Sequence, residues 1–197
     1  MANSGIFSAT KDYFTENLKM HNKRTMNIVL AAAIAALYAT LTILQNLLLP
    51  GSASMAVQFR VSEVLTVFSV FTSAAVPGLT IGCILANISS LSSLGPYDLI
   101  FGSLASFFAA LSMYTLRNVR IFKLPVFAAL MPALMNGIFV GFEIDFFFIN
   151  QGSFDFADFL VQGGLVAIGE LAVLFVLGLP LCRLIEVREL DKKLHLN

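Results

Sequence analysis

The chain has 197 residues, of which 58% are hydrophobic and 12% are charged, and its formal net charge is zero. Soluble domains average about 45–50% apolar and about 25% charged residues, so this composition excludes an ordinary soluble domain and indicates a protein folded in a lipid bilayer. The sequence also has no polybasic tract that would suggest a nucleic-acid partner.

The two ends of the chain are polar, and the region between them is apolar. Residues 1–25 lack the brief apolar core of a cleaved signal peptide, so they predict an amphipathic cytoplasmic arm. Residues 26–184 predict one transmembrane domain, and residues 185–197 predict a cytoplasmic tail. No long linker, low-complexity tract or internal repeat divides the chain, so we expect a single all-α bundle of six transmembrane helices.

The first three spans are predicted from their apolar length and from the residues that break them. A helical span needs about 20 mostly apolar residues. The first runs from Met26 to Leu49 and stops before Pro50. The second runs from Val61 to Val76, where Pro77 and Gly78 predict a tight turn into a third span that ends near Leu94.

Three further spans complete the predicted bundle. The fourth runs from Tyr97 to Leu116, the fifth from about Leu124 to Phe142, and the sixth from about Phe159 to Leu181. A basic loop is predicted between the fourth and fifth spans. An acidic loop is predicted between the fifth and sixth, with four acidic residues: Glu143, Asp145, Asp155 and Asp158.

The basic residues predict the orientation of the bundle. Threading six spans alternately places eleven of the twelve Lys and Arg residues on one side, with only Arg60 near the other. The positive-inside rule then puts both termini in the cytoplasm of a multi-pass plasma-membrane protein. Merging the second and third spans into one broken span would scatter the basic loops, so six spans are favoured over five. The eleven residues are Lys11, Lys19, Lys23, Arg24, Arg117, Arg120, Lys123, Arg183, Arg188, Lys192 and Lys193.

Several classes of enzyme are excluded by missing motifs. The chain has no phosphate-binding Gly-x-x-x-x-Gly-Lys-Ser/Thr loop, so it does not hydrolyse nucleotide by that route. His21 and His195 both lie in the terminal segments, which excludes a His-based catalytic or zinc site within the membrane. Cys83 and Cys182 are distant apolar-segment residues that predict reduced packing groups rather than a disulfide or a metal site. We therefore expect no nucleotide hydrolysis through such a loop and no cofactor; an intramembrane carboxylate enzyme or a channel stays open.

The first span carries a stripe of small residues. Ala31, Ala35 and Ala39 recur every four residues, with Ala32 and Ala36 beside them. Residues at this spacing share a helix face, and small ones let another backbone approach closely. The pattern is compatible with packing inside the bundle and with contact to another protein.

Polar residues inside the predicted spans are the candidates for function. A charged side chain at mid-bilayer costs about 2.5–3.5 kcal/mol on insertion scales, so it usually faces a cavity or a partner. Five polar or acidic residues lie in the outer halves or at the outer ends of their predicted spans. Together they predict an outward-facing pocket for a small, polar, planar or cationic solute. They are Glu63, Asn87, Asp98, Asn136 and Glu143.

Each candidate also has a structural interpretation. Arg60 could pair with Glu63 at a helix mouth, Asp98 could cap the fourth helix, and the two asparagines could be hydrogen-bond links between helices. Glu170 lies near the middle of the sixth span and could be a core carboxyl. The phenylalanines at 146–148 predict an interfacial or lid element.

Three blocks, Val57–Thr66, Pro77–Asn87 and Asp98–Ala105, together resemble the queuosine-precursor transporter family. Its members are substrate-binding S components of energy-coupling factor (ECF) transporters, and the resemblance covers nearly the whole chain. It implies a six-helix transport subunit without its own ATPase that binds a queuosine precursor, such as the aminomethyl deazaguanine base, and docks on a coupling subunit carrying two ATPases. An S component for another small polar solute or a vitamin is the alternative.

The resemblance also implies roles for the candidate residues. Glu63 and Asn87 lie inside the matching blocks and are expected first in the site, followed by Asp98, Asn136 and Glu143. A carboxylate suits the adjacent N–H and amino group of a deazaguanine ring, an amide suits its carbonyl, and a second acid suits the aminomethyl cation. Arg60 and Gln58 would shape the mouth or a closing loop over residues 50–59. The alanine stripe would contact the coupling subunit.

Overall fold

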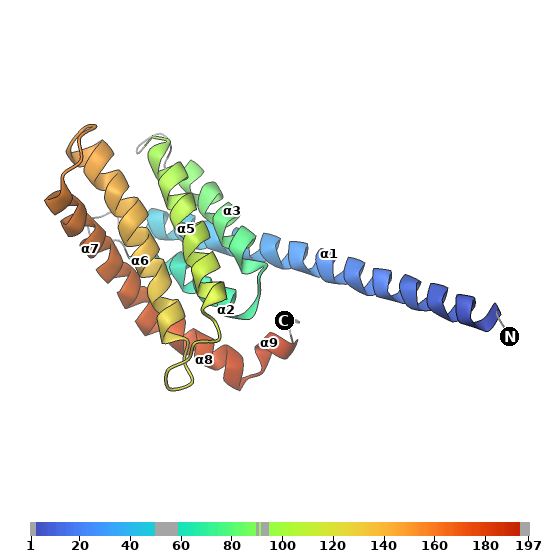
Figure 1. The fold of residues 1–197 in the computed structure, drawn as a ribbon. Coiled ribbons are helices and arrows are strands. Elements are labelled where there is room, and N and C mark those ends of the chain that lie inside the picture. The colour runs from blue at the N-terminus through green and yellow to red at the C-terminus, as the bar shows by residue number, and fades with distance from the viewer. Residues whose placement is uncertain (1–2, 50–58, 90, 92–94, 194–197) are drawn as a thin grey trace.

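The structure is a computed structural model that describes residues 3–49, 59–89, 91 and 95–193 (Figure 1). Helices dominate these ranges, which contain no strand apart from an isolated bridge between Ile121 and Leu124. The all-α prediction is therefore confirmed.

Helix α1 is a single helix from Asn3 to Leu48 and ends one residue before the predicted stop. At about 1.5 Å per residue its 46 residues span about 69 Å, more than twice the roughly 30 Å hydrocarbon thickness of a bilayer. Figure 1 shows its N-terminal part projecting away from the other helices. The predicted arm over residues 1–25 and the first span therefore share one continuous helix without a break between them.

The second predicted span is a short, irregular pair of segments. A 3₁₀ segment, η1 (Val61–Val67), runs into α2 (Phe68–Phe71), and the chain becomes extended at Thr72 before α3 begins at Ala75. Helix α3 covers Ala75–Ile88 and ends well before the predicted Leu94.

The predicted turn at Pro77 and Gly78 is wrong, because both residues lie in the first turn of α3. Proline is tolerated there, since the backbone N–H that it lacks would have no partner within the helix. Gly78 is needed for packing rather than for a turn: a Cβ atom on it would lie 2.8 Å from the carbonyl oxygen of Ala31.

The later helices are longer. Helix α5 covers Tyr97–Thr115, close to the prediction, and α6 covers Val126–Glu143. Helix α6 continues into the π-helical segment η2 (Ile144–Ile149). Helix α7 (Phe156–Val173) continues through the π-helical segment η3 (Leu174–Gly178) into α8 (Leu179–Val187), and α9 covers Leu190–Lys193.

The predicted acidic loop is therefore wrong for Glu143 and Asp145, which lie in α6 and η2 and are buried. The helix continues past Phe142, as α6 through Glu143 and then in π form through Ile149, so both acids lie in helix. Asp155 caps α7, because its side chain accepts hydrogen bonds from the N–H groups of Ala157 and Asp158 at 2.8 and 3.1 Å.

The helices pack in an order that follows the chain: α1 on α3, α3 on α5, α5 on α6, and α6 on α7. Close approach relies on small residues. A Cβ atom on Gly163 of α7 would lie only 2.5 Å from the carbonyl oxygen of Gly137 on α6, so the two backbones touch.

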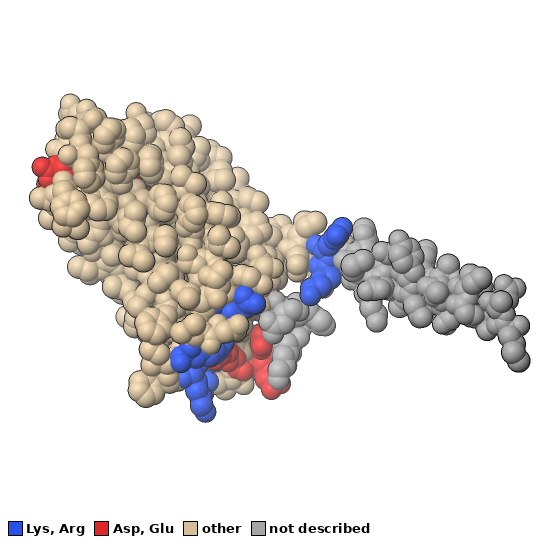
Figure 2. Space-filling model, in the orientation of Figure 1, with Lys and Arg blue, Asp and Glu red and all other residues tan. Residues whose placement is uncertain are grey.

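Within the described part of the chain, four helical stretches are long and apolar enough to cross a membrane, namely Asn22–Leu48, Tyr97–Thr115, Val126–Ile149 and Phe156–Val187. Two more, Val61–Phe71 and Ala75–Ile88, are apolar but shorter, so the six-span bundle stays a prediction. Many large apolar side chains are exposed, including Leu47 and Val176, as expected of a surface in lipid. Figure 2 shows a broad surface without charge above the Lys and Arg residues.

Candidate functional site

The candidate polar residues are all withdrawn from the surface. Their exposed fractions lie between 0% and 8%, although they come from five different segments of the chain. The set comprises Arg60, Glu63, Asn87, Asp98, Asn136, Glu143 and Glu170. Burial of polar groups on this scale is unfavourable unless they interact with one another or with a ligand.

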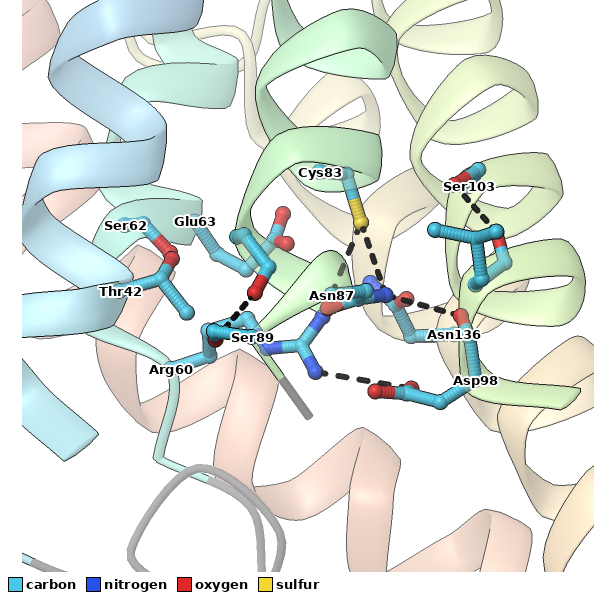
Figure 3. Close-up of polar contacts among 12 residues, drawn as sticks. Thr42, Arg60, Ser62, Glu63, Cys83, Asn87, Ser89, Asp98, Ser103 and Asn136 are labelled. Carbon is cyan, nitrogen blue, oxygen red and sulfur yellow. Dashed lines mark hydrogen bonds and ion pairs between the residues drawn. The ribbon is translucent and has the colours of Figure 1, made fainter. Parts of the chain in front are cut away.

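Arg60 lies where the chain enters η1, and its guanidinium points into the bundle. Its Nη2 atom lies 3.9 Å from Oδ1 of Asp98 in the first turn of α5, and its Nη1 lies 4.0 Å from Sγ of Cys83 on α3 (Figure 3). The ion pair thus joins Arg60 to Asp98, whereas the sequence had suggested Glu63. The N-cap of α5 is Pro96, so Asp98 does not take the predicted capping position.

Asn87 connects α3 to α5. Its side-chain amide donates a hydrogen bond of 2.8 Å to the backbone carbonyl of Asp98 and lies 3.6 Å from Sγ of Cys83. Gly102 gives this amide its space, because a Cβ atom there would lie 2.8 Å from Nδ2 of Asn87 and 3.3 Å from Oδ1 of Asp98. The sequence reasoning did not single out Gly102, although its position one turn after Asp98 places it on the same helix face.

Glu63 is completely buried in η1 and is bound by Tyr38 of α1, whose hydroxyl donates to Oε1. Its second oxygen, Oε2, has no hydrogen-bond partner among the described residues. The sequence reasoning did not identify Tyr38 as a candidate site residue. Its spacing of four residues from Thr42 and seven from Gln45 marks a polar stripe within the first span that would have indicated it.

Glu170 and Asn136 form the α6–α7 side of the cluster. Nδ2 of Asn136 donates to Oε1 of Glu170 at 3.3 Å, and Glu170 lies within electrostatic range of Glu63 and Arg60. The hydrogen bond to Asn136 fits the interpretation of Glu170 as a core carboxyl group. The electrostatic interaction of Glu170 with Arg60 also links it to the other candidate polar residues.

Glu143 completes the cluster from the end of α6. It lies within electrostatic range of Asp98 and Arg60. Arg60 thus forms an ion pair with Asp98 and lies within electrostatic range of three more carboxyl groups, those of Glu63, Glu143 and Glu170.

The cluster carries hydrogen-bonding capacity that the described residues do not use. One oxygen of each of Glu63, Glu143 and Glu170 is buried without a hydrogen-bond partner there. Such atoms are rare in folded proteins and are unfavourable unless a ligand or water satisfies them. Acceptors from three helices with an excess of acidic groups can bind a compact solute that brings several N–H donors or a positive charge.

The alanine stripe of α1 divides between two faces. Ala31 and Ala35 pack against α3, where Cβ atoms on Gly78 and Gly82 would lie 2.8 and 3.0 Å from their carbonyl oxygens. Ala39 is also buried. These three therefore make the packing contact within the bundle. The other two, Ala32 and Ala36, are exposed, so contact with another protein stays a prediction for them.

An aromatic cluster adjoins the ends of α5 and α6. Tyr97 stacks on Phe147 with ring centroids 4.0 Å apart, and Phe101 and Phe142 pack beside them. An apolar groove of about 390 Å³ borders the cluster, lined by Phe101, Ile138, Phe139, Phe142, Phe154 and Phe159. Gln58 and the loop predicted to close over the pocket, apart from Phe59, lie outside the described residues.

Comparison with known proteins assigns the family. The family described as QueT transporter matches residues 28–187. The "Queuosine precursor transporter QueT" of Lactococcus lactis subsp. cremoris (strain MG1363) is 32% identical over 167 residues, which cover 80% of this chain and 90% of that protein. No solved structure shows a significant match. With a family match over most of its length and a helical bundle enclosing a polar cluster, the chain belongs to the QueT transporter family.

Proposed function

We propose that the chain is a substrate-binding membrane subunit that captures a queuosine precursor, a 7-deazaguanine base, from outside the cell for ATP-driven uptake. The main observation is the buried set of polar residues, in which Arg60 forms an ion pair with Asp98 and one oxygen of each of Glu63, Glu143 and Glu170 has no hydrogen-bond partner among the described residues. A transporter role fits the family, and the Lactococcus relative is named for the same class of substrate.

The proposed ligand complements the cluster group by group. One edge of a deazaguanine carries an N–H and an amino group, which a carboxylate such as Glu63 can accept through its unpartnered Oε2. The ring carbonyl needs a donor, and Asn87 or Asn136 carries an amide. An aminomethyl cation needs an acidic acceptor, which Glu143 or Glu170 can supply through its unpartnered Oε2.

The energy for uptake would come from other subunits. The sequence has no phosphate-binding loop, so we propose that a transmembrane coupling subunit with two ATPases drives transport. The exposed Ala32 and Ala36 of α1 are the proposed contact, because small side chains allow a partner helix to approach closely. In the proposed arrangement six spans place both termini in the cytoplasm.

Calorimetric titration of the full-length protein in detergent tests the substrate. We expect binding of deazaguanine bases and none of riboflavin, biotin or thiamine. Glu63→Gln removes a charged acceptor, and a lost charge-assisted hydrogen bond of about 1.5–3 kcal/mol weakens binding roughly tenfold or more.

Glu186→Gln is the matched control, since Glu186 pairs with Arg120 and Arg183 away from the cluster and its loss should leave affinity unchanged. Binding of a vitamin with no binding of any deazaguanine would contradict the proposed substrate.

A further inference from the structure

Helix α1 carries a polar stripe on the face that it turns toward the bundle. Tyr38, Thr42 and Gln45 are spaced by four and three residues, and their exposed fractions are 0%, 2% and 8%. This spacing puts them on one side of the helix. Polar side chains inside a membrane-spanning helix are unfavourable without partners, so the contacts of this stripe call for an explanation.

All three side chains contact one short segment. Tyr38 donates to Oε1 of Glu63, and Thr42 donates to Oγ of Ser62 at 2.7 Å (Figure 3 shows the latter pair). The amide nitrogen of Gln45 donates to the carbonyl of Phe59, and its oxygen accepts from the N–H of Val61 at 2.8 Å. The stripe thus binds the segment Phe59–Glu63 at four of its five residues.

The segment Phe59–Glu63 has few stabilising hydrogen bonds within itself. Arg60 is the N-cap of η1 and makes no side-chain cap hydrogen bond, and the first N–H groups of a helix have no partner within it. Gln45 supplies that partner for Val61 from another helix. A 3₁₀ helix also has poorer hydrogen-bond geometry than an α-helix, so contacts from outside contribute more to holding it.

The stripe is itself fixed against the bundle. A Cβ atom on Gly82 of α3 would lie 2.8 Å from Cβ of Tyr38, so α1 and α3 are in direct contact at this level. The rotation of α1 about its axis is therefore set by α3. That rotation in turn sets where Arg60 and Glu63 lie.

We propose that Tyr38, Thr42 and Gln45 are positioning residues that hold Arg60 and Glu63 in their ligand-binding geometry, with Tyr38 occupying Oε1 of Glu63 so that Oε2 faces the ligand. The proposed role in ligand binding rests on the proposed function. The proposed role in holding the segment Phe59–Glu63 does not. Tyr38 acts on the ligand through Glu63.

Hydrogen exchange in the ligand-free, full-length protein tests the structural part. Tyr38→Phe keeps the ring and removes only the hydroxyl, and Gln45→Leu removes both hydrogen bonds at the start of η1. Each should raise the amide exchange rate of residues 59–67 by about tenfold. Tyr114→Phe is the control, because Tyr114 contacts Arg117 at the far end of α5 and should leave this segment unchanged. Unchanged exchange in both variants would overturn the proposal.

A double-mutant cycle on ligand affinity tests the route through Glu63. The aminomethyl deazaguanine base is the probe. Tyr38→Phe should weaken binding about tenfold in the otherwise natural protein and cause no further loss when Glu63→Gln is already present. Additive losses would show that Tyr38 does not act through Glu63 and would overturn the proposal. If the natural protein binds no deazaguanine, the proposed function fails, and the exchange experiment still decides whether the stripe positions the segment.

Discussion

Arg60 has the most demanding position among the individual residues. It is 5% exposed, its Nε atom has no hydrogen-bond partner among the described residues, and it interacts with carboxyl groups from several helices. Its ion pair with Asp98, 3.9 Å between Nη2 and Oδ1, places opposite charges together where each alone would be costly to bury. Arg60 therefore makes the burial of the Asp98 carboxylate tolerable inside the bundle.

We therefore expect Arg60→Gln to destabilise the ligand-free protein by about 3 kcal/mol or more, because it leaves the buried Asp98 carboxylate without its ion-pair partner. Thermal unfolding in detergent measures this change. Arg188→Gln, at an exposed position near the C-terminus, is the control and should change stability by less than about 0.5 kcal/mol. Equal effects of the two substitutions would show that Arg60 has no such role.

At the level of the helices, glycine sets the packing of α6 on α7. Gly137 and Gly163 place backbone against backbone, and Cβ atoms on both would lie within 3 Å of the opposite carbonyl oxygen. The neighbouring Gly164 faces open space. Because Asn136 and Glu170 sit on these same helices and share a hydrogen bond, the approach of the helices also determines the geometry of that side of the cluster.

Adjacent glycines of α7 make a matched test. Gly163→Ala must separate α6 from α7 and should lower the free energy of unfolding by about 1–3 kcal/mol, as overpacking does. Gly164→Ala should be neutral or should stabilise the helix by up to about 1 kcal/mol. Chemical or thermal unfolding of both variants in the same detergent measures the difference. Similar stability of the two variants would refute the backbone contact.

For the whole molecule, α1 has two separate faces. The buried face packs on α3 and binds the Phe59–Glu63 segment, while the opposite face exposes small alanines. Under the proposed function, the exposed face of α1 that carries these alanines contacts the coupling subunit. A bulky residue should therefore have different consequences on the two faces.

Co-purification with the coupling subunit and its ATPases tests this division. Ala36→Trp should abolish or strongly reduce capture of the complex without lowering the stability of the isolated chain, because the new side chain blocks close approach of the partner. Val176→Trp, at an exposed position on η3, is the control and should leave capture unchanged. A complex that forms normally with Ala36→Trp would contradict the proposed interface.

The sequence by itself determined the class of protein and much of its layout. Apolar content and breaker residues predicted helices, and α5 ends within one residue of its predicted bounds because hydropathy and proline effects act locally. The same reasoning selected polar residues that all proved to be buried.

Only the tertiary structure decided which of these residues meet. It paired Arg60 with Asp98, joined Glu63 to Tyr38 by a hydrogen bond, placed the break before α3 at Thr72, and buried Asp145 within the π-helical segment η2. Such pairings depend on the rotation and depth of one helix against another. Contacts between residues far apart in the chain set both, and a local pattern does not encode them.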